Sequence, residues 1–338
     1  MPHCPVLLQA RDRRAGAPGC LKPFREGSKA VTTLYVSHPS ALDHVVPEGH
    51  PERPSRIRTV ERVLENERFA GLVRAQAPKA EASAATLVHP QDYVDAILAA
   101  APKEGMVAID GDTVLSPGTL ESVLRAVGGA MHAVDAVVAG ECANAFVAMR
   151  PPGHHAERNR AMGFCVFNQA AIAARHARKA HGLSRVALVD WDVHHGNGSQ
   201  DIFWDDGTVM YASTHQMPLF PGTGAASERG TQDTIVNVPL RPNDDGAVFR
   251  EAFETIVARV DAFQPDLILV SAGFDAHRLD PLANLRLDEA DFGWATRKLL
   301  DLADRHAGGR LVSVLEGGYS LEGLGKSVHE HVDALMGH

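Results

Sequence analysis

Residues 185–198 read Arg185-Val186-Ala187-Leu188-Val189-Asp190-Trp191-Asp192-Val193-His194-His195-Gly196-Asn197-Gly198. The first five are mostly apolar and β-branched, which predicts a buried strand. Side chains alternate along an extended chain, so Asp190, Asp192 and His194 share one side if the chain stays extended. Carboxylate oxygen and neutral imidazole nitrogen both ligate Zn²⁺, at about 2.0–2.2 Å. The run therefore indicates a strand that ends at a divalent-metal site, with a merely polar surface loop as the alternative.

Three other apolar runs also stop at a turn that carries glycine, proline or polar side chains. They are residues 145–149, followed by Arg150-Pro151-Pro152-Gly153-His154-His155; residues 266–271, followed by Ala272-Gly273-Phe274-Asp275-Ala276-His277; and residues 311–315, followed by Glu316-Gly317-Gly318-Tyr319. In open parallel sheets, ligands bind in the crevice at the carboxyl ends of the strands. Four such strand ends predict one shared site.

From about Thr32 onward, strand-like runs alternate with amphipathic helical stretches. This alternation predicts an α/β fold with a mostly parallel sheet and helices on both faces. A first strand is expected over residues 34–36, and Ser55 is the expected N-cap of the first helix. Helices are expected over residues 55–66, 119–139, 168–181, 246–263, 288–306 and 321–336.

Composition narrows the class of protein. With 338 residues, 45% of them hydrophobic, the chain can form one large α/β domain or two smaller ones. The net charge of −9 disfavours nucleic-acid binding, because phosphates would not be neutralised. No apolar run approaches the roughly 20 residues that span a bilayer, so no membrane segment is expected. The scattered Cys4, Cys20, Cys142 and Cys165 fit a reducing compartment, and we expect a cytoplasmic protein.

Residues 1–30 differ from the rest of the chain. Their basic side chains are interspersed with glycine and proline, without helical or strand periodicity. We expect a flexible or loosely packed extension ahead of a domain at residues 31–338.

Several of these runs together resemble one enzyme family. The segments that follow the four strands, with His50-Pro51-Glu52-Arg53-Pro54 and Phe220-Pro221-Gly222-Thr223-Gly224, resemble the histone deacetylase family. These motifs resemble those of bacterial class II-like deacetylase-like amidohydrolases, which are relatives of the acetylpolyamine amidohydrolases, more closely than those of class I enzymes. The resemblance runs from about Thr33 to the C-terminus. It implies the arginase–deacetylase fold as a single domain, and hydrolysis of N-acetyl amides of lysine side chains or polyamines to acetate and free amine.

The resemblance also implies a metal site formed by Asp192, His194 and Asp275. Such a set leaves coordination open for water and a substrate carbonyl, as a catalytic site requires. One Zn²⁺ per chain is the expected ion, and a set with two carboxylates would also accept Fe²⁺, Mn²⁺ or Co²⁺.

Five further residues match the family's catalytic machinery. His154 and His155 would manage protons on the activated water and the leaving amine, oriented by Asp190 and Asn197 respectively. Class I enzymes carry aspartate where this chain has Asn197, so we expect His155 to be less basic than with a carboxylate partner. The hydroxyl of Tyr319 would donate to the oxyanion of the tetrahedral intermediate.

The resemblance implies two more groups of residues. The substrate channel would be lined by Gly153, Phe164, Phe220 and Leu282. A structural K⁺ would be held by Asp190, Asp192, His194, Ser213 and Thr214. Arg53 matches a residue of the acetate exit. Leu282 stands where polyamine-selective eukaryotic relatives carry an acidic residue, which weakens a polyamine interpretation.

Rival functions remain open from the sequence alone. One is an arginase-like ureohydrolase with two Mn²⁺ ions, and another is a protein that binds acetylated ligands without turnover. Within the deacetylase interpretation, the substrate is an acetyl-lysine side chain, an acetylated polyamine or another slim acyl amine. The partner is then an acetylated amine, and a homo-oligomer is compatible with the chain.

Overall fold

The computed structural model describes Met1 and residues 32–338. The extension expected at residues 1–30 therefore falls, Met1 apart, outside the described residues. Residues Val31–His338 form one compact unit.

The core of this unit is an eight-stranded sheet in the order β2-β1-β5-β10-β9-β6-β7-β8, in which all neighbouring strands run parallel. The strands are β1 (Thr33–Ser37), β2 (Val73–Gln76), β5 (Asn144–Val147), β6 (Val186–Asp190), β7 (Val209–Gln216), β8 (Ile235–Leu240), β9 (Leu267–Ala272) and β10 (Leu311–Leu315). A separate antiparallel pair joins β3 (Val107–Ala108) to β4 (Val114–Leu115). The predicted α/β fold with a parallel central sheet is confirmed.

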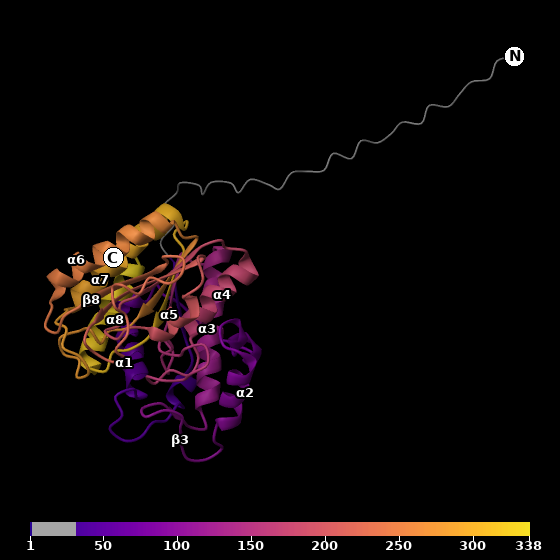
Figure 1. Cartoon of the computed structure of the whole chain (residues 1–338), viewed down its shortest axis with the longest axis vertical. Helices are drawn as coiled ribbons and strands as arrows, with labels where there is room; N and C mark the ends of the chain where they lie inside the picture. Colours follow the sequence, from indigo (N-terminus) through magenta and orange to yellow (C-terminus); the bar gives the residue numbers. More distant parts are fainter. Residues whose placement is uncertain (2–31) are drawn as a thin grey trace. The chain divides into compact units, whose positions relative to one another are not determined.

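Helices cover both faces of the sheet (Figure 1). They are α1 (Ser55–Leu64), α2 (Gln91–Ala100), α3 (Thr119–Ala139), α4 (Gln169–His181), α5 (Asn197–Phe203), α6 (Gly246–Phe263), α7 (Glu289–His306) and α8 (Leu321–Leu335), with short 3₁₀ helices η1 (Pro39–Leu42), η2 (Glu67–Phe69) and η3 (Ala82–Leu87). One layer packs α1, α8, α7 and α6 in that order, and the other packs α3 against α4. The sheet is therefore buried on both sides, which suits continuous apolar strands.

The expected helices lie close to the observed ones, and two coincide with α3 and α6. The expected cap of α1 is wrong. Pro54 is the N-cap, and Ser55 lies inside the first turn with its Oγ buried and unpartnered among the described residues. Proline is tolerated there because the first helical N–H groups have no intrahelical acceptor.

Helix α3 is more apolar than the sequence analysis allowed, since no apolar run was expected to approach the length of a membrane span. By length and composition it is apolar enough to cross a membrane, although 67% of its apolar window is buried within this fold. It packs on β1, β5 and β10, so its burial identifies it as a core helix of the sheet.

The four strands that end in reactive side chains are neighbours at the centre of the sheet. They occur in the order β5-β10-β9-β6, and their carboxyl ends meet at one edge. The two middle members, β9 and β10, come last along the chain.

A buried ion cluster fixes the segment that precedes α1. Glu52 is fully buried, and its carboxylate accepts hydrogen bonds from Arg150 Nη2 at 2.6 Å and Arg56 Nη1 at 3.1 Å. Burial by itself raises the pKa of Glu52, but the two guanidinium groups outweigh it and lower the pKa to about 2. Because the partners come from α1 and from the segment after β5, the cluster joins two parts of the chain that flank the strand ends.

We expect Glu52→Gln to lower the free energy of unfolding at pH 7 by about 3–5 kcal/mol, since it leaves two buried guanidinium groups uncompensated. The folded-state pKa of Glu52 is depressed, so its contribution is present above about pH 4.5 and is lost as the pH falls toward about 2. Urea unfolding of both proteins at several pH values measures this difference. Glu322→Gln is the control, because its exposed pair with Lys326 contributes at most about 0.5 kcal/mol. A destabilisation by Glu52→Gln that stayed constant down to pH 3 would contradict the assignment.

Candidate active site

The candidate metal ligands converge because their strands pair in register. β6 and β9 are neighbours, with Asp190 opposite Ser271, and the chain continues from them to Asp192, His194 and Asp275. His194 Nδ1 lies 3.1 Å from Asp192 Oδ1 and 3.1 Å from Asp275 Oδ2. All three residues are buried, and one ligand atom from each lies within 4.8 Å of the others. The arrangement can hold one divalent ion.

Two glycines make room for these carboxylates. A Cβ on Gly273 would overlap Asp192 Oδ2, and one on Gly317 would overlap Asp275 Oδ2. The N–H of Gly317 also donates to Asp192 Oδ2 at 2.8 Å. Glycine is needed at both positions because backbone and carboxylate approach so closely.

The histidine pair lies beside this set, with ring centroids 4.0 Å apart. His154 Nδ1 is 3.0 Å from Asp190 Oδ2, and His155 Nδ1 is 2.8 Å from Asn197 Oδ1. The structure thus places the orienting side chains where the resemblance put them.

The two rings differ strongly in basicity. Burial by itself lowers the pKa of His154, but the carboxylates of Asp192 and Asp190 outweigh it and raise the pKa to about 10. Burial and the neighbouring imidazoles of His154 and His194 hold the pKa of His155 well below its usual range. The hydrogen bond between His155 Nδ1 and Asn197 Oδ1 favours the charged ring and so acts to raise the pKa. The low pKa of His155 therefore comes chiefly from burial. The expectation that His155 would be more basic with a carboxylate partner in place of Asn197 stays a prediction.

Glu157 is a residue of this site that the sequence analysis missed. Asn197 Nδ2 donates to Glu157 Oε1 at 2.7 Å, which directs the amide oxygen of Asn197 toward His155. An amide oxygen can only accept, so His155 Nδ1 carries the proton and Nε2 remains available. Glu157 stands two residues after His155 in the motif, which was the available signal.

Glu316 supports the other side of the pair. Its Oε2 accepts from the backbone N–H of Gly153 at 2.7 Å and of His154 at 3.2 Å, and burial raises its pKa to about 7. A carboxyl from β10 thereby fixes the loop that follows β5.

Tyr319 is positioned by an arginine that the sequence analysis did not single out. The guanidinium of Arg56 lies 5.0 Å from the ring centroid of Tyr319, and its Nε donates to Gly318 O at 2.7 Å. Arg53, matched to the acetate exit, is exposed, whereas Arg56 is fully buried. The buried guanidinium next to this tyrosine is therefore that of Arg56.

A cavity of about 250 Å³ leads to the site. Its lining consists of Asp112, His155, Gly163, Phe164, His194, Leu219, Phe220, Leu282 and Tyr319. The ring of Phe220 lies 5.1 Å from that of His155, and the ring of Phe164 lies 5.8 Å from that of Tyr319. Two aromatic side chains thus flank a cavity whose lining also includes the candidate metal ligand His194 and the candidate proton acceptor His155.

Two channel residues have unexpected surroundings. Gly153 was expected to line the channel, but it is buried and does not line the cavity. A Cβ at this position would overlap the side chain of Gln169. Phe164 adopts a φ of 69°, a conformation that non-glycine residues seldom take, and Thr113 Oγ1 accepts its backbone N–H at 3.0 Å. The position of this aromatic wall depends on that backbone geometry.

The residues matched to a K⁺ site lie in, or directly after, the neighbouring strands β6 and β7. Ser213 pairs in register with Asp190, and its Oγ is 2.9 Å from His215 Nδ1. Thr214 Oγ1 is buried and has no hydrogen-bond partner within residues 32–338. The side chains of Asp192 and His194 face each other at the candidate metal site, which leaves their carbonyl groups for a second cation.

Comparisons with known proteins agree with this geometry. A family model described as the histone deacetylase domain matches residues 50–335. A probable deacetylase of Archaeoglobus fulgidus is 40% identical over 306 residues, which cover 87% of this chain and 83% of the relative. A histone deacetylase-like amidohydrolase of Pseudomonas aeruginosa is 40% identical over 278 residues, covering 80% and 73%. The crystal structure of an HDA15 HD domain superposes with a TM-score of 0.86 at 33% identity, covering 92% of this chain and 89% of that one.

We expect Glu157→Ala to release the amide of Asn197 and to mix the tautomers of His155. Turnover should fall about 10- to 100-fold, the range for lost outer-shell partners. Nitrogen chemical shifts of the His155 ring measure the tautomer directly. Glu157→Gln is the matched control, because its amide oxygen can still accept from Asn197. Wild-type ring shifts in Glu157→Ala would show that Asn197 is held by other contacts.

Proposed function

Because this chain belongs to the histone deacetylase family, we propose that it hydrolyses N-acetyl amides to acetate and a free amine. One observation carries the proposal. The cavity that admits a slim ligand ends at His194, His155 and Tyr319, which are a metal ligand, a proton acceptor and a hydroxyl donor. These groups together are what amide hydrolysis requires.

The residues present fit a divalent metal cofactor. Asp192, His194 and Asp275 offer two carboxylates and one imidazole within a buried cluster, and Zn²⁺ is the ion proposed first. Fe²⁺, Mn²⁺ and Co²⁺ accept the same donor set. An ion held there supplies Lewis-acid polarisation of the substrate carbonyl and makes water more acidic.

The chain itself handles the protons. His155 Nδ1 is committed to Asn197 Oδ1, so Nε2 is the atom that accepts a proton from the attacking water. His154 is held by Asp190, whose carboxylate favours the charged ring, so His154 assists protonation of the leaving amine. Tyr319 lines the same cavity as His155, and its hydroxyl donates to the oxyanion.

The cavity lining suggests which substrates enter. Phe164, Phe220, Leu219 and Leu282 suit an aliphatic linker, as in acetyl-lysine, an acetylated polyamine or another slim acyl amine. Asp112 is the one carboxylate among the lining residues, and it would attract a cationic group or an N–H of the substrate. Asp112 belongs to none of the motifs that carry the family resemblance.

Three further features belong to the same proposal. A K⁺ near Asp190, Ser213 and Thr214 would be structural rather than catalytic. A cytoplasmic location is supported by Cys142 and Cys165, which are buried free thiols. The arginase-like alternative needs bridging carboxylates, and His277, which occupies one such sequence position, lies instead 3.2 Å from Glu289.

We expect Tyr319→Phe to reduce kcat about 10²- to 10³-fold, because the oxyanion loses one preorganised donor. Steady-state kinetics measure the loss, while metal content and circular dichroism confirm that the site and fold persist. Near-normal kcat would remove Tyr319 from the proposed mechanism.

We expect the zinc-loaded protein to release acetate from acetylputrescine, acetylspermidine or an acetyl-lysine peptide, and a metal-free sample to release none. Asp112→Asn should lower kcat/KM for the cationic acetylpolyamines more than for uncharged N-acetylbutylamine, which is the matched control substrate. Binding of these compounds without acetate release would favour the non-catalytic alternative. Urea release from arginine would favour the ureohydrolase.

A further inference from the structure

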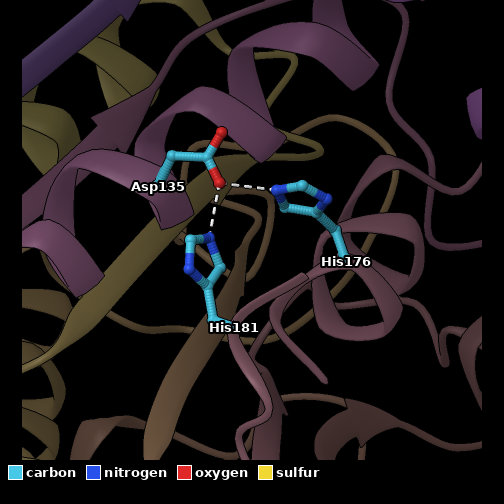
Figure 2. Close-up of side chains that lie close together, drawn as sticks. All are labelled: Asp135, His176 and His181. Carbon is cyan, nitrogen blue, oxygen red and sulfur yellow. Dashed lines mark hydrogen bonds and ion pairs between the residues drawn. The ribbon is translucent and has the colours of Figure 1, made fainter. Parts of the chain in front are cut away.

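A second cluster of metal-ligating side chains lies on the helices (Figure 2). Asp135 of α3 faces His176 and His181 of α4, and both imidazole Nε2 atoms lie 2.6 Å from the same oxygen, Asp135 Oδ1. The two rings stand nearly perpendicular, at 88°, with centroids 5.5 Å apart. The two rings approach the carboxylate oxygen from different directions, and the three ligand atoms lie within 4.8 Å of one another.

This cluster belongs to the opposite edge of the sheet from the candidate active site. Asp135 lies in the last turns of α3, and His181 is the last residue of α4. The helix that precedes a strand in a parallel sheet runs back against it, so its carboxyl end lies at the amino edge of that sheet. Strands β5 and β6 begin shortly after α3 and α4 end, whereas the catalytic side chains follow the carboxyl ends of the strands.

The donor atoms suit a first-row divalent ion. Zn²⁺ binds imidazole nitrogen and carboxylate oxygen at about 2.0–2.2 Å, which in tetrahedral geometry separates ligand atoms by roughly 3.3 Å. Each of the observed 2.6 Å contacts would have to open by about 0.7 Å to reach that separation. Such a movement is small for side chains that project from helix surfaces.

The surroundings permit an ion to enter. The side chains of Asp135, His176 and His181 are 48%, 15% and 25% exposed, so water can occupy the remaining coordination positions. Two helix carboxyl ends lie nearby, and their partial negative charge favours a cation.

We propose that Asp135, His176 and His181 form a second binding site for a divalent transition metal, which joins α3 to α4 and is separate from the catalytic centre. The chemistry selects ions that accept nitrogen and oxygen ligands, with Zn²⁺ as the probe. The inference does not depend on the proposed activity, because it rests on a different set of residues.

The test compares zinc uptake by the full-length holoenzyme and its variants in equilibrium dialysis. We expect the wild type to bind one more zinc ion per chain than the double variant His176→Gln/His181→Gln. Asp135→Asn should weaken this additional binding at least about tenfold. His132→Gln is the matched control, because His132 lies one turn before Asp135 on α3 but outside the cluster. It should bind as the wild type does.

A second readout follows the ligand atoms themselves. Zinc added to the holoenzyme should shift the Nε2 resonances of His176 and His181 and leave that of His132 unchanged, while the variants retain wild-type circular dichroism. Equal zinc uptake by wild type and double variant, or unchanged Nε2 resonances of His176 and His181, would overturn the inference and leave the cluster a metal-free ion pair. Neither result depends on deacetylation, so the proposed function stands or falls separately.

Discussion

Negative charge buried at the carboxyl edge of the central strands is the constraint on which the rest of the site depends. Asp190, Asp192, Asp275 and Glu316 are all at most 1% exposed, and they follow or end three adjacent strands. A carboxylate taken out of water costs several kcal/mol unless cations or N–H donors surround it. The imidazoles and the backbone N–H groups of the glycine-rich turns supply part of that compensation, and a divalent ion at the candidate metal site would add to it. The same need explains why glycines stand where side chains would otherwise separate the carboxylates from the backbone.

The sequence predicted the parts of this arrangement that are local. Four apolar runs ending in polar turns identified the central strands. Asp192 and His194 do meet, but β6 ends at Asp190 and the chain bends over residues 192–194, so the alternation expected of an extended chain is not what brings them together. Strands β7 and β8 were missed because β7 ends in the polar run Ser213–Gln216 and β8 contains Asn237 and Pro239, so neither reads as a continuous apolar run. Glu157 stands close to the histidine pair in sequence, but its bond to Asn197 joins distant segments. The positions of Arg56 and Asp112 depend wholly on contacts between distant segments, which no local pattern encodes.

The two adjacent histidines show how neighbours in sequence acquire different chemistry. His154 contacts a buried carboxylate directly, whereas His155 contacts a neutral amide whose own partner, Glu157, is only partly buried. One ring is therefore stabilised as a cation and the other as a neutral base. The difference in pKa arises from the residues that contact each histidine, not from the histidines themselves. Two adjacent histidines in a sequence therefore do not reveal which ring is charged and which is neutral.

The position of β9 and β10 has a consequence for how the chain is made. These strands are synthesised last, yet they occupy the middle of the sheet, between β5 and β6. Until they emerge from the ribosome, the nascent chain has two three-stranded halves, β2-β1-β5 and β6-β7-β8, each with an open inner edge. Unpaired strand edges invite association with other chains, and insertion of β9 and β10 removes both inner edges at once. Asp275 follows β9, so the candidate metal-ligand set is complete only once β9 has been made and lies beside β6.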